Sequence, residues 1–446
     1  MSMFLLQVLW FLFVGLSQSY ADSWQCPAKQ TNSDMVKVST LNFLAMDKYR
    51  GYKPAWMAME PNYRSAIYGW SEESVRQRYL GNGNNYLDPY MYHERLRLLV
   101  EKYPNQFELW QIASTHFGFP VYAISIGDST DTKKTAIMHI ASLHGNEMIG
   151  VNYLLDAVES LLQGATTESV ALLKNEFVLW FVPMANPDGN WLSMRRAHAD
   201  TYGKKNGKNT DGTCECFAYE GVDLSANFPT HHSEKMNEIV VAESETKSLM
   251  NLLQRYNFVS MLSIHTGGNR WLTPPIATTN GPNKELVQSI GASVVQHDAN
   301  MIAKQLSSSS DVREIVWFYE YRGFPAFALE YPSDIAPMSL PERESARGVV
   351  QNMITEFWNS MLEKSYVQGK VVNQKGEAIQ AEIYIPQNNR TETIWPSSEK
   401  GEFALLWPKK EIVSVRIRAK GYLDAEKRID LRTGRSDVTI VLQSVQ

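Results

Sequence analysis

Two histidines and two glutamates follow, or end, apolar runs that are typical of buried strands. The four residues are His144, Glu147, His265 and Glu330. Because open α/β sheets place ligands beyond the carboxyl ends of their strands, we expect these side chains to converge. His144 and Glu147 are three residues apart at the start of a helical pattern, and this spacing puts both on one face. With His265 they form a set of two histidines and one glutamate, which leaves the fourth position on a zinc ion open.

A zinc ion in such a site activates a water molecule near neutral pH and polarises a carbonyl group. Glu330 would take the proton from that water and pass it to the leaving amine, so the four residues together predict amide hydrolysis. Each piece alone has a simpler explanation. A single histidine at a strand end is more often a hydrogen-bonded structural residue, and a buried glutamate could equally form a salt bridge.

The segments that must position these residues alternate between strand and helix patterns. Strands are predicted at residues 136–143, 177–184, 258–264 and 324–329, and helices at residues 90–103, 149–162, 246–256 and 349–362. Continuously apolar strands alternating with helices predict an α/β fold with a covered sheet. From residue 365 onward, short strand-like runs follow one another without a helix between them, which predicts a separate small β-sandwich.

Composition excludes several classes of protein. The 446 residues carry 43 lysines and arginines against 48 aspartates and glutamates, a net charge of −5, so we expect no nucleic-acid partner. Hydrophobic residues make up 44% of the chain, which is ordinary for a globular protein and excludes a disordered one. Three cysteines are too few for a disulfide scaffold, and Cys26, Cys214 and Cys216 could form at most one internal disulfide.

The N-terminus has the features of an export signal. Residues 3–16 form an apolar run that is shorter than the roughly 20 residues a membrane-spanning helix needs. Ser19-Tyr20-Ala21 then has the pattern of a signal-peptidase site, although no lysine or arginine precedes the apolar run. We predict a signal peptide at residues 1–21, with an uncleaved anchor as the alternative, and a secreted or periplasmic mature chain without a membrane span. A glycosylation sequon begins at Asn389 and matters only in a eukaryotic source.

Taken in order, the motifs resemble those of the zinc metallocarboxypeptidase family of the carboxypeptidase A and carboxypeptidase N/E type. The matching pieces are the His144-x-x-Glu147 pair, Asn186-Pro-Asp-Gly189, Gly221-Val-Asp-Leu224, Asn227-Phe-Pro229, Ser-Ile-His265 and Phe-Ala-Leu-Glu330. The resemblance runs from about residue 90 to residue 362. It implies a mixed central β-sheet flanked by helices, in a catalytic domain at residues 85–364 that follows an N-terminal extension at residues 22–84. The segment at residues 365–446 resembles the transthyretin-like β-sandwich of the N/E branch.

The resemblance also assigns roles to residues. It implies that His144, Glu147 and His265 bind one Zn²⁺ ion and that Glu330 is the general acid/base acting on a peptide or protein substrate. The family uses an arginine to polarise the scissile carbonyl, and its best match here is Lys204. Arg195 and Arg196 are rivals for that role, and a solvated basic loop is the simpler alternative.

One family feature is missing. Where the family has an Asn-Arg pair that binds the substrate's terminal carboxylate, this sequence has Ser225-Ala226, and the family's downstream tyrosine falls in the polar run at residues 307–310. The protein could bind the carboxylate elsewhere, for example through Arg270 or Arg322. It could instead hydrolyse amides without a free terminal carboxylate, such as internal or cell-wall peptide bonds, or it could be a zinc-retaining peptide-binding protein. We expect an active hydrolase, because the proton shuttle is retained together with all three zinc ligands. The oligomeric state is not predicted.

A second histidine motif has a simpler explanation. The pair His231-His232 could bind another metal ion, but adjacent histidines at a surface are usually solvated.

Overall fold

The computed structural model of the chain describes residues 34–39, 43, 86–164, 168–196, 203–208, 221–275, 282–337, 339–385 and 394–445. The predicted signal peptide, most of the N-terminal extension, all three cysteines and the sequon at Asn389 lie outside these residues. Among the helices that are described, none combines the length and the apolarity that crossing a bilayer would require.

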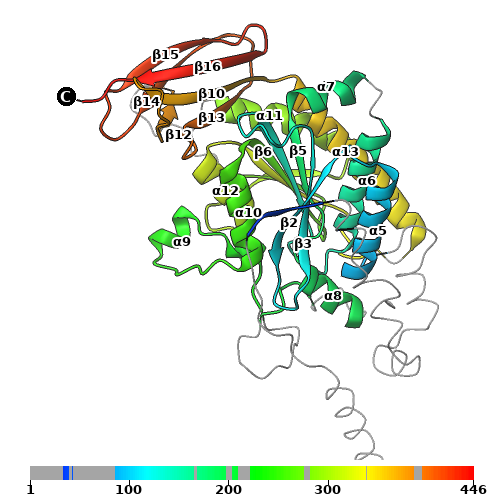
Figure 1. Ribbon diagram of the computed structural model, residues 1–446. Helices are drawn as coiled ribbons and strands as arrows, with labels where there is room; N and C mark the ends of the chain where they lie inside the picture. Colours follow the sequence, from blue (N-terminus) through cyan, green and yellow to red (C-terminus); the bar gives the residue numbers. More distant parts are fainter. Residues whose placement is uncertain are drawn as a thin grey trace, which may run out of the picture.

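A mixed sheet of nine strands forms the centre of the fold (Figure 1). In spatial order the strands are β1 (Val36–Val38), β2 (Glu108–Ser114), β3 (Pro120–Ile126), β5 (Val178–Val182), β4 (Thr135–Ala141), β6 (Asn257–His265), β9 (Ala326–Glu330), β7 (Arg270–Thr273) and β8 (Ile302–Gln305). The four inner strands β5, β4, β6 and β9 run parallel to one another, whereas β3 and β7 pair antiparallel at either side of this group. Every residue of β4, β5 and β6 is buried, as expected for parallel strands covered on both faces. The predicted mixed α/β fold is therefore confirmed.

Helices lie on both sides of this sheet, and others lie beyond its edges (Figure 1). They are α5 (Pro89–Lys102), α6 (Ile149–Gln163), α7 (Glu168–Glu176), α8 (Pro187–Arg196), α9 (His231–Lys235), α10 (Ser244–Arg255), α11 (Pro282–Val295), α12 (Arg313–Arg322) and α13 (Leu340–Leu362), with a short 3₁₀ turn η3 (Ser225–Asn227). Figure 1 shows α5, α6 and α13 on one side of the sheet and α10 and α12 on the other. The start of α13 is fixed by a capping box between Ser339 and Glu342.

Two small sheets follow α13 directly, one mixed and one antiparallel. One has the order β13-β10-β16 and the other β12-β11-β14-β15. Their strands are β10 (Ser365–Asn373), β11 (Glu382–Tyr384), β12 (Ile394–Pro396), β13 (Glu402–Trp407), β14 (Ile412–Arg418), β15 (Ala425–Asp430) and β16 (Arg435–Leu442). Burial alternates along β14 with Val413, Val415 and Ile417 inside, which is the two-residue period of a strand that has one buried face. The transthyretin-like character of this region and the domain boundaries stay predictions.

The C-terminal sheets and the large sheet share one hydrophobic core. The Phe177 ring packs against the Tyr366 ring with their centroids 5.5 Å apart, and Phe324 packs against Trp395 at 6.2 Å. The Thr132 hydroxyl also donates a hydrogen bond of 2.9 Å to Glu402. We refer to these three contacts as the seam.

Candidate metal centre

Three neighbouring parallel strands end at the same edge of the sheet and bring the predicted residues together. His144 lies three residues beyond β4, and Glu147 lies in the turn before α6. His265 is the last residue of β6, and it stands directly opposite Glu330, the last residue of β9. The predicted convergence at the carboxyl ends of the strands is therefore observed.

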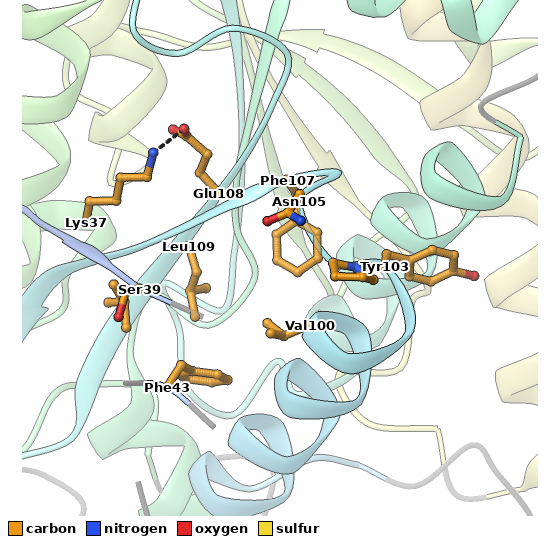
Figure 2. Close-up of a pocket in the computed structure, with 11 residues that line it drawn as sticks. Lys37, Ser39, Phe43, Val100, Tyr103, Asn105, Phe107, Glu108 and Leu109 are labelled. Carbon is orange, nitrogen blue, oxygen red and sulfur yellow. Dashed lines mark hydrogen bonds and ion pairs between the residues drawn. The ribbon is translucent and has the colours of Figure 1, made fainter. Parts of the chain in front are cut away.

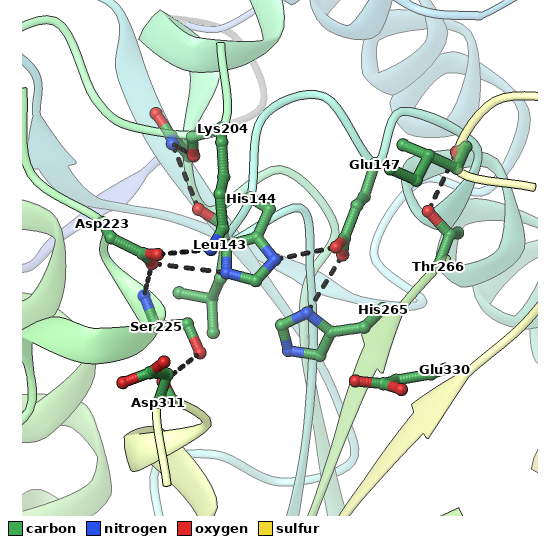
Figure 3. Close-up of polar contacts among 12 residues, drawn as sticks. Leu143, His144, Glu147, Lys204, Asp223, Ser225, His265, Thr266, Asp311 and Glu330 are labelled. Carbon is green, nitrogen blue, oxygen red and sulfur yellow. Dashed lines mark hydrogen bonds and ion pairs between the residues drawn. The ribbon is translucent and has the colours of Figure 1, made fainter. Parts of the chain in front are cut away.

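Glu147 lies between the two histidines (Figure 3). Its Oε1 is 2.7 Å from Nδ1 of His144, and its Oε2 is 3.0 Å from Nδ1 of His265. The two imidazole rings have centroids 4.9 Å apart. One ligand atom from each of the three residues lies within 4.8 Å of the others, and Glu147 and His265 are buried. This geometry is compact enough for three atoms to bind a single ion.

Each histidine faces a second carboxylate with its other ring nitrogen. Nε2 of His144 is 3.3 Å from Oδ1 of Asp223, and Nε2 of His265 is 2.8 Å from Oε1 of Glu314. Such partners fix the tautomer and orientation of metal-binding histidines. Asp223 belongs to a motif that is visible in the sequence, but the motif alone assigns it no role. Glu314 could not be found from the sequence, because no pattern indicated the helix α12 that carries it.

The histidines and carboxylates of this cluster shift one another's pKa values toward the charged forms. Burial opposes the charged form of His144, but Glu147 and Asp223 outweigh it and raise the pKa of His144 to about 9. Burial also opposes the charged form of His265, yet Glu147 and Glu314 raise its pKa well above the usual value. In Glu147, burial would raise the pKa, but the two histidines lower it to about 2. The cluster therefore concentrates negative charge that only a cation, whether protons or a metal ion, can balance.

The donor set fits zinc. Two imidazole nitrogens and one carboxylate are the ligands of many catalytic zinc sites, which keep one position open. The Oε2 atom of Glu147 is buried and makes no well-aligned hydrogen bond, although Nδ1 of His265 is near. A buried polar atom of this kind is costly unless a partner satisfies it, and a metal ion bound by all three residues would do so.

Lys204 lies beside the cluster. Its ammonium group is 2.7 Å from Oδ2 of Asp223, the same carboxylate that faces His144 (Figure 3). Its backbone carbonyl accepts hydrogen bonds from the Gly145 amide and from Nδ2 of Asn186, which also donates to the Leu143 carbonyl. Asn186 of the Asn-Pro-Asp-Gly motif therefore joins the end of β4 to the segment that carries Lys204.

Glu330 lies beside His265 (Figure 3). It forms an ion pair with Arg270 of β7. Its carboxylate is mostly shielded from solvent, whereas the Arg270 side chain is 41% exposed. A side chain at Gly268 would come within 2.7 Å of Glu330 Oε2, so the glycine leaves room for this carboxylate. Of the two arginines considered as carboxylate anchors, Arg270 thus reaches the site.

The other candidates whose side chains the structure describes do not join the cluster. Arg322 is buried at the far end of α12, roughly 12 Å along the helix axis from Glu314, and donates to the Tyr256 carbonyl. The side chains of Arg195 and Arg196 lie outside the described residues. His231 and His232 belong to no second group of close metal-binding side chains among the residues that the structure describes, and the exposed His231 pairs with Glu320 at 3.9 Å.

A cavity of about 260 Å³ lies elsewhere, between β1, α5 and the start of β2 (Figure 2). Its lining includes Phe43, Val100 and Leu109, together with the ion pair between Lys37 and Glu108. None of the predicted site residues borders it, so this cavity is not the site described above.

Comparisons with known proteins agree with the geometry. Over 271 residues the chain is 22% identical to carboxypeptidase D of Homo sapiens, which covers 56% of this chain and 18% of that protein. It is 29% identical to carboxypeptidase E of Caenorhabditis elegans over 150 residues, or 31% of this chain and 30% of that protein. The matched part of the chain thus spans less than a fifth of the human protein and less than a third of the nematode one.

The fold is similar to that in the crystal structure of thrombin activatable fibrinolysis inhibitor. The TM-score is 0.51 at 17% sequence identity, over 65% of this chain and 80% of that one. Residues 92–335 match the family model of zinc carboxypeptidases, and this match covers more than half of the chain. The chain therefore belongs to the zinc carboxypeptidase family.

Proposed function

We propose that this protein is a zinc-dependent peptidase that hydrolyses peptide bonds, with Glu330 as general acid/base. His144, Glu147 and His265 would hold one zinc ion. The observation that carries the proposal is the meeting of these three side chains with Glu330 at the carboxyl ends of β4, β6 and β9.

When bound, a zinc ion supplies a Lewis acid and lowers the pKa of a water molecule. Glu330 is positioned next to His265, where its carboxylate can accept a proton from that water and donate it to the leaving amine. Its ion pair with Arg270 holds the carboxylate at this place beside His265.

Lys204 is proposed to stabilise the carbonyl oxygen of the scissile bond. Its side chain is 45% exposed, so the ammonium group can reach a substrate while Asp223 holds it near the cluster. A fixed positive charge near a developing oxyanion lowers the energy of the transition state. A lysine is a point charge, so we expect it to act without the bidentate geometry of an arginine.

The residues at positions 225 and 226 bear on whether the protein recognises the C-terminal carboxylate of its substrate. Ser225 donates its hydroxyl to the buried Glu314, and Ala226 has an apolar side chain, so neither offers a charge to a terminal carboxylate. Arg270 is the exposed cation beside Glu330. Hydrolysis of amides without a free terminal carboxylate is therefore a second candidate, favoured by the residues at positions 225 and 226.

A peptide library separates these possibilities. The zinc-loaded chain is incubated with peptides of which half have free and half have amidated C-termini, and products are read by mass spectrometry with a chelator control. Loss of single residues from the free-acid half alone indicates a carboxypeptidase, with Arg270 as the first residue to substitute. Equal cleavage of both halves indicates that the chain end is not recognised. No chelator-sensitive cleavage of these peptides or of cell-wall peptides would favour a binding protein.

Glu330→Gln tests the catalytic role directly. We expect turnover to fall about 10²- to 10⁴-fold, which is the usual contribution of a general acid/base, while zinc content is unchanged. Glu399→Gln, at an exposed turn of the C-terminal sheets, is the matched control and should leave turnover unchanged. Equal turnover in parent and Glu330→Gln would contradict the assigned role.

Export is the remaining part of the proposal. If residues 1–21 are a signal peptide, the secreted or periplasmic protein should begin at Asp22, which N-terminal sequencing of the purified mature chain would establish. A chain that keeps Met1 would contradict it.

A further inference from the structure

Glu314 is a buried carboxylate that the proposed reaction does not use. It lies in the first turn of α12 and has no solvent-exposed surface. An ionised carboxylate is costly to remove from water unless polar partners surround it. The partners of Glu314 therefore indicate what it does.

Three groups donate to this carboxylate. The Ser225 hydroxyl lies 2.7 Å from Oε2, the Ser263 hydroxyl lies 3.0 Å from Oε1, and Nε2 of His265 lies 2.8 Å from the same Oε1. An ionised carboxylate can only accept hydrogen bonds, so Nε2 of His265 must carry a hydrogen to lie this close. Glu314 thereby selects the tautomer of His265.

The selected tautomer has a consequence at the opposite side of the ring. With the hydrogen on Nε2, the neutral imidazole has its lone pair on Nδ1, which faces Glu147 at 3.0 Å. His144 repeats the pattern, since its Nε2 faces Asp223 while its Nδ1 faces Glu147. Once each ring has released its second proton, both lone pairs would be directed at the point where a metal ion would lie.

We propose that Glu314 is a positioning residue, which holds His265 in the tautomer and orientation that bind the metal ion, with Ser225 and Ser263 fixing the carboxylate in turn. The inference rests on the proposed function and extends it to a residue on α12. It also explains the serine at position 225, because the Ser225 hydroxyl anchors the carboxylate that orients a metal ligand.

A purely structural role for Glu314 would be to attach η3 to α12. That attachment has other contacts, however. The Ser225 hydroxyl also lies 3.2 Å from the Asp311 carbonyl, and the Phe228 ring packs against Trp317 of α12 with centroids 5.9 Å apart. The two explanations therefore differ in what happens to metal affinity when the fold is intact.

The test is the zinc affinity of the full chain, measured by competition with a chromophoric chelator. We expect Glu314→Gln to bind zinc about 10-fold more weakly and Glu314→Ala up to about 100-fold more weakly, in the range known for lost outer partners of metal ligands. Glu320→Gln is the matched control on the same helix, because Glu320 contacts His231 rather than the cluster, and its affinity should equal that of the parent.

A second readout reports the orientation of the ligands. Cobalt(II) in place of zinc gives visible absorption bands that depend on ligand geometry, and these bands should shift in Glu314→Gln but not in Glu320→Gln. If Glu314→Ala does not fold, Glu314→Gln decides the matter, because the amide keeps the shape of the side chain. Equal affinity and identical cobalt spectra in parent and Glu314→Gln would overturn the inference and leave the proposed function intact. Failure of the parent to bind zinc at all would overturn both.

Discussion

Loading the site with zinc should displace two protons. In the metal-free protein His144 has a pKa of about 9, and the pKa of His265 is raised well above its usual value, chiefly because both rings face Glu147 against the opposing effect of burial. At pH 7.5 a group with a pKa of about 9 is protonated in a ratio of about 30 to 1. A metal ion can bind only the deprotonated nitrogens, so each ring must release its proton.

The number of protons distinguishes this arrangement from ordinary histidines. Two unperturbed rings with a pKa of 6.5 would together release only about 0.2 proton at pH 7.5, and ionisation of a bound water would add at most about one. Glu147 and Asp223 add none, because the pKa of Glu147 is lowered to about 2 and that of Asp223 is also lowered by His144 and Lys204 despite burial. We therefore expect a release of about two protons or more, and an apparent zinc affinity that rises about 100-fold per pH unit near neutrality.

Isothermal titration calorimetry measures this release directly. Zinc is titrated into the metal-free chain in buffers of different ionisation enthalpy, and the slope of the observed enthalpy against that quantity gives the number of protons. Asp223→Asn removes one of the carboxylates that raise the pKa of His144, so it should release fewer protons. A release of about one proton or less by the parent would refute the reasoning, because the two rings would then be neutral before the metal ion arrives.

Three further predictions concern stability. Burial and the neighbouring Glu245 raise the pKa of Asp188 to about 7, so its contribution to stability is present below its ordinary pKa of 3.8 and is lost as the pH rises through about 7. Asp188→Asn should therefore lose less stability than the parent between pH 4 and pH 8 in urea unfolding, and parallel pH profiles would contradict this. Gly203 has a φ of +79°, and an added Cβ would lie 2.1 Å from the Gly189 carbonyl oxygen. Gly203→Ala should therefore lower the melting temperature. It should also displace the segment that carries Lys204, which would be measured as reduced turnover. Trp395→Ala removes a buried ring from the seam and should lower the free energy of unfolding by about 3–5 kcal/mol in urea, whereas a loss below about 1 kcal/mol would mean that the seam contributes little.

The parts of the fold that the sequence predicted best are those with strong apolar patterns. The strands β4, β5, β6 and β9 are buried along almost their whole length, so their runs are recognisable without any neighbour. The edge strand β8 is exposed at every position, and its residues show no pattern typical of a strand. β8 forms a strand because it pairs with β7. The residues of β8 alone do not indicate this pairing.

The candidate site also contains residues that the sequence predicted and one that it did not. His144, Glu147, His265 and Glu330 lie at or just beyond the ends of recognisable strands, and this position predicted that they would meet. Glu314 could not be predicted, because glutamate is almost never fully buried unless a partner is present, and its partners Ser225 and Ser263 are distant in sequence. In the sequence Ser225 stands out only as a departure from the family, and its contact with Glu314 is visible only in three dimensions.

The seam and the metal-binding side chains lie at opposite ends of the central strands. Phe177 precedes β5, Phe324 precedes β9 and Thr132 precedes β4, so all three contacts lie at the amino ends of the central strands, whereas the metal-binding side chains lie at their carboxyl ends. The C-terminal sheets therefore contact the large sheet at the end opposite to the metal-binding side chains. A surface or partner protein that bound the C-terminal sheets would leave the carboxyl ends of the central strands accessible to a peptide.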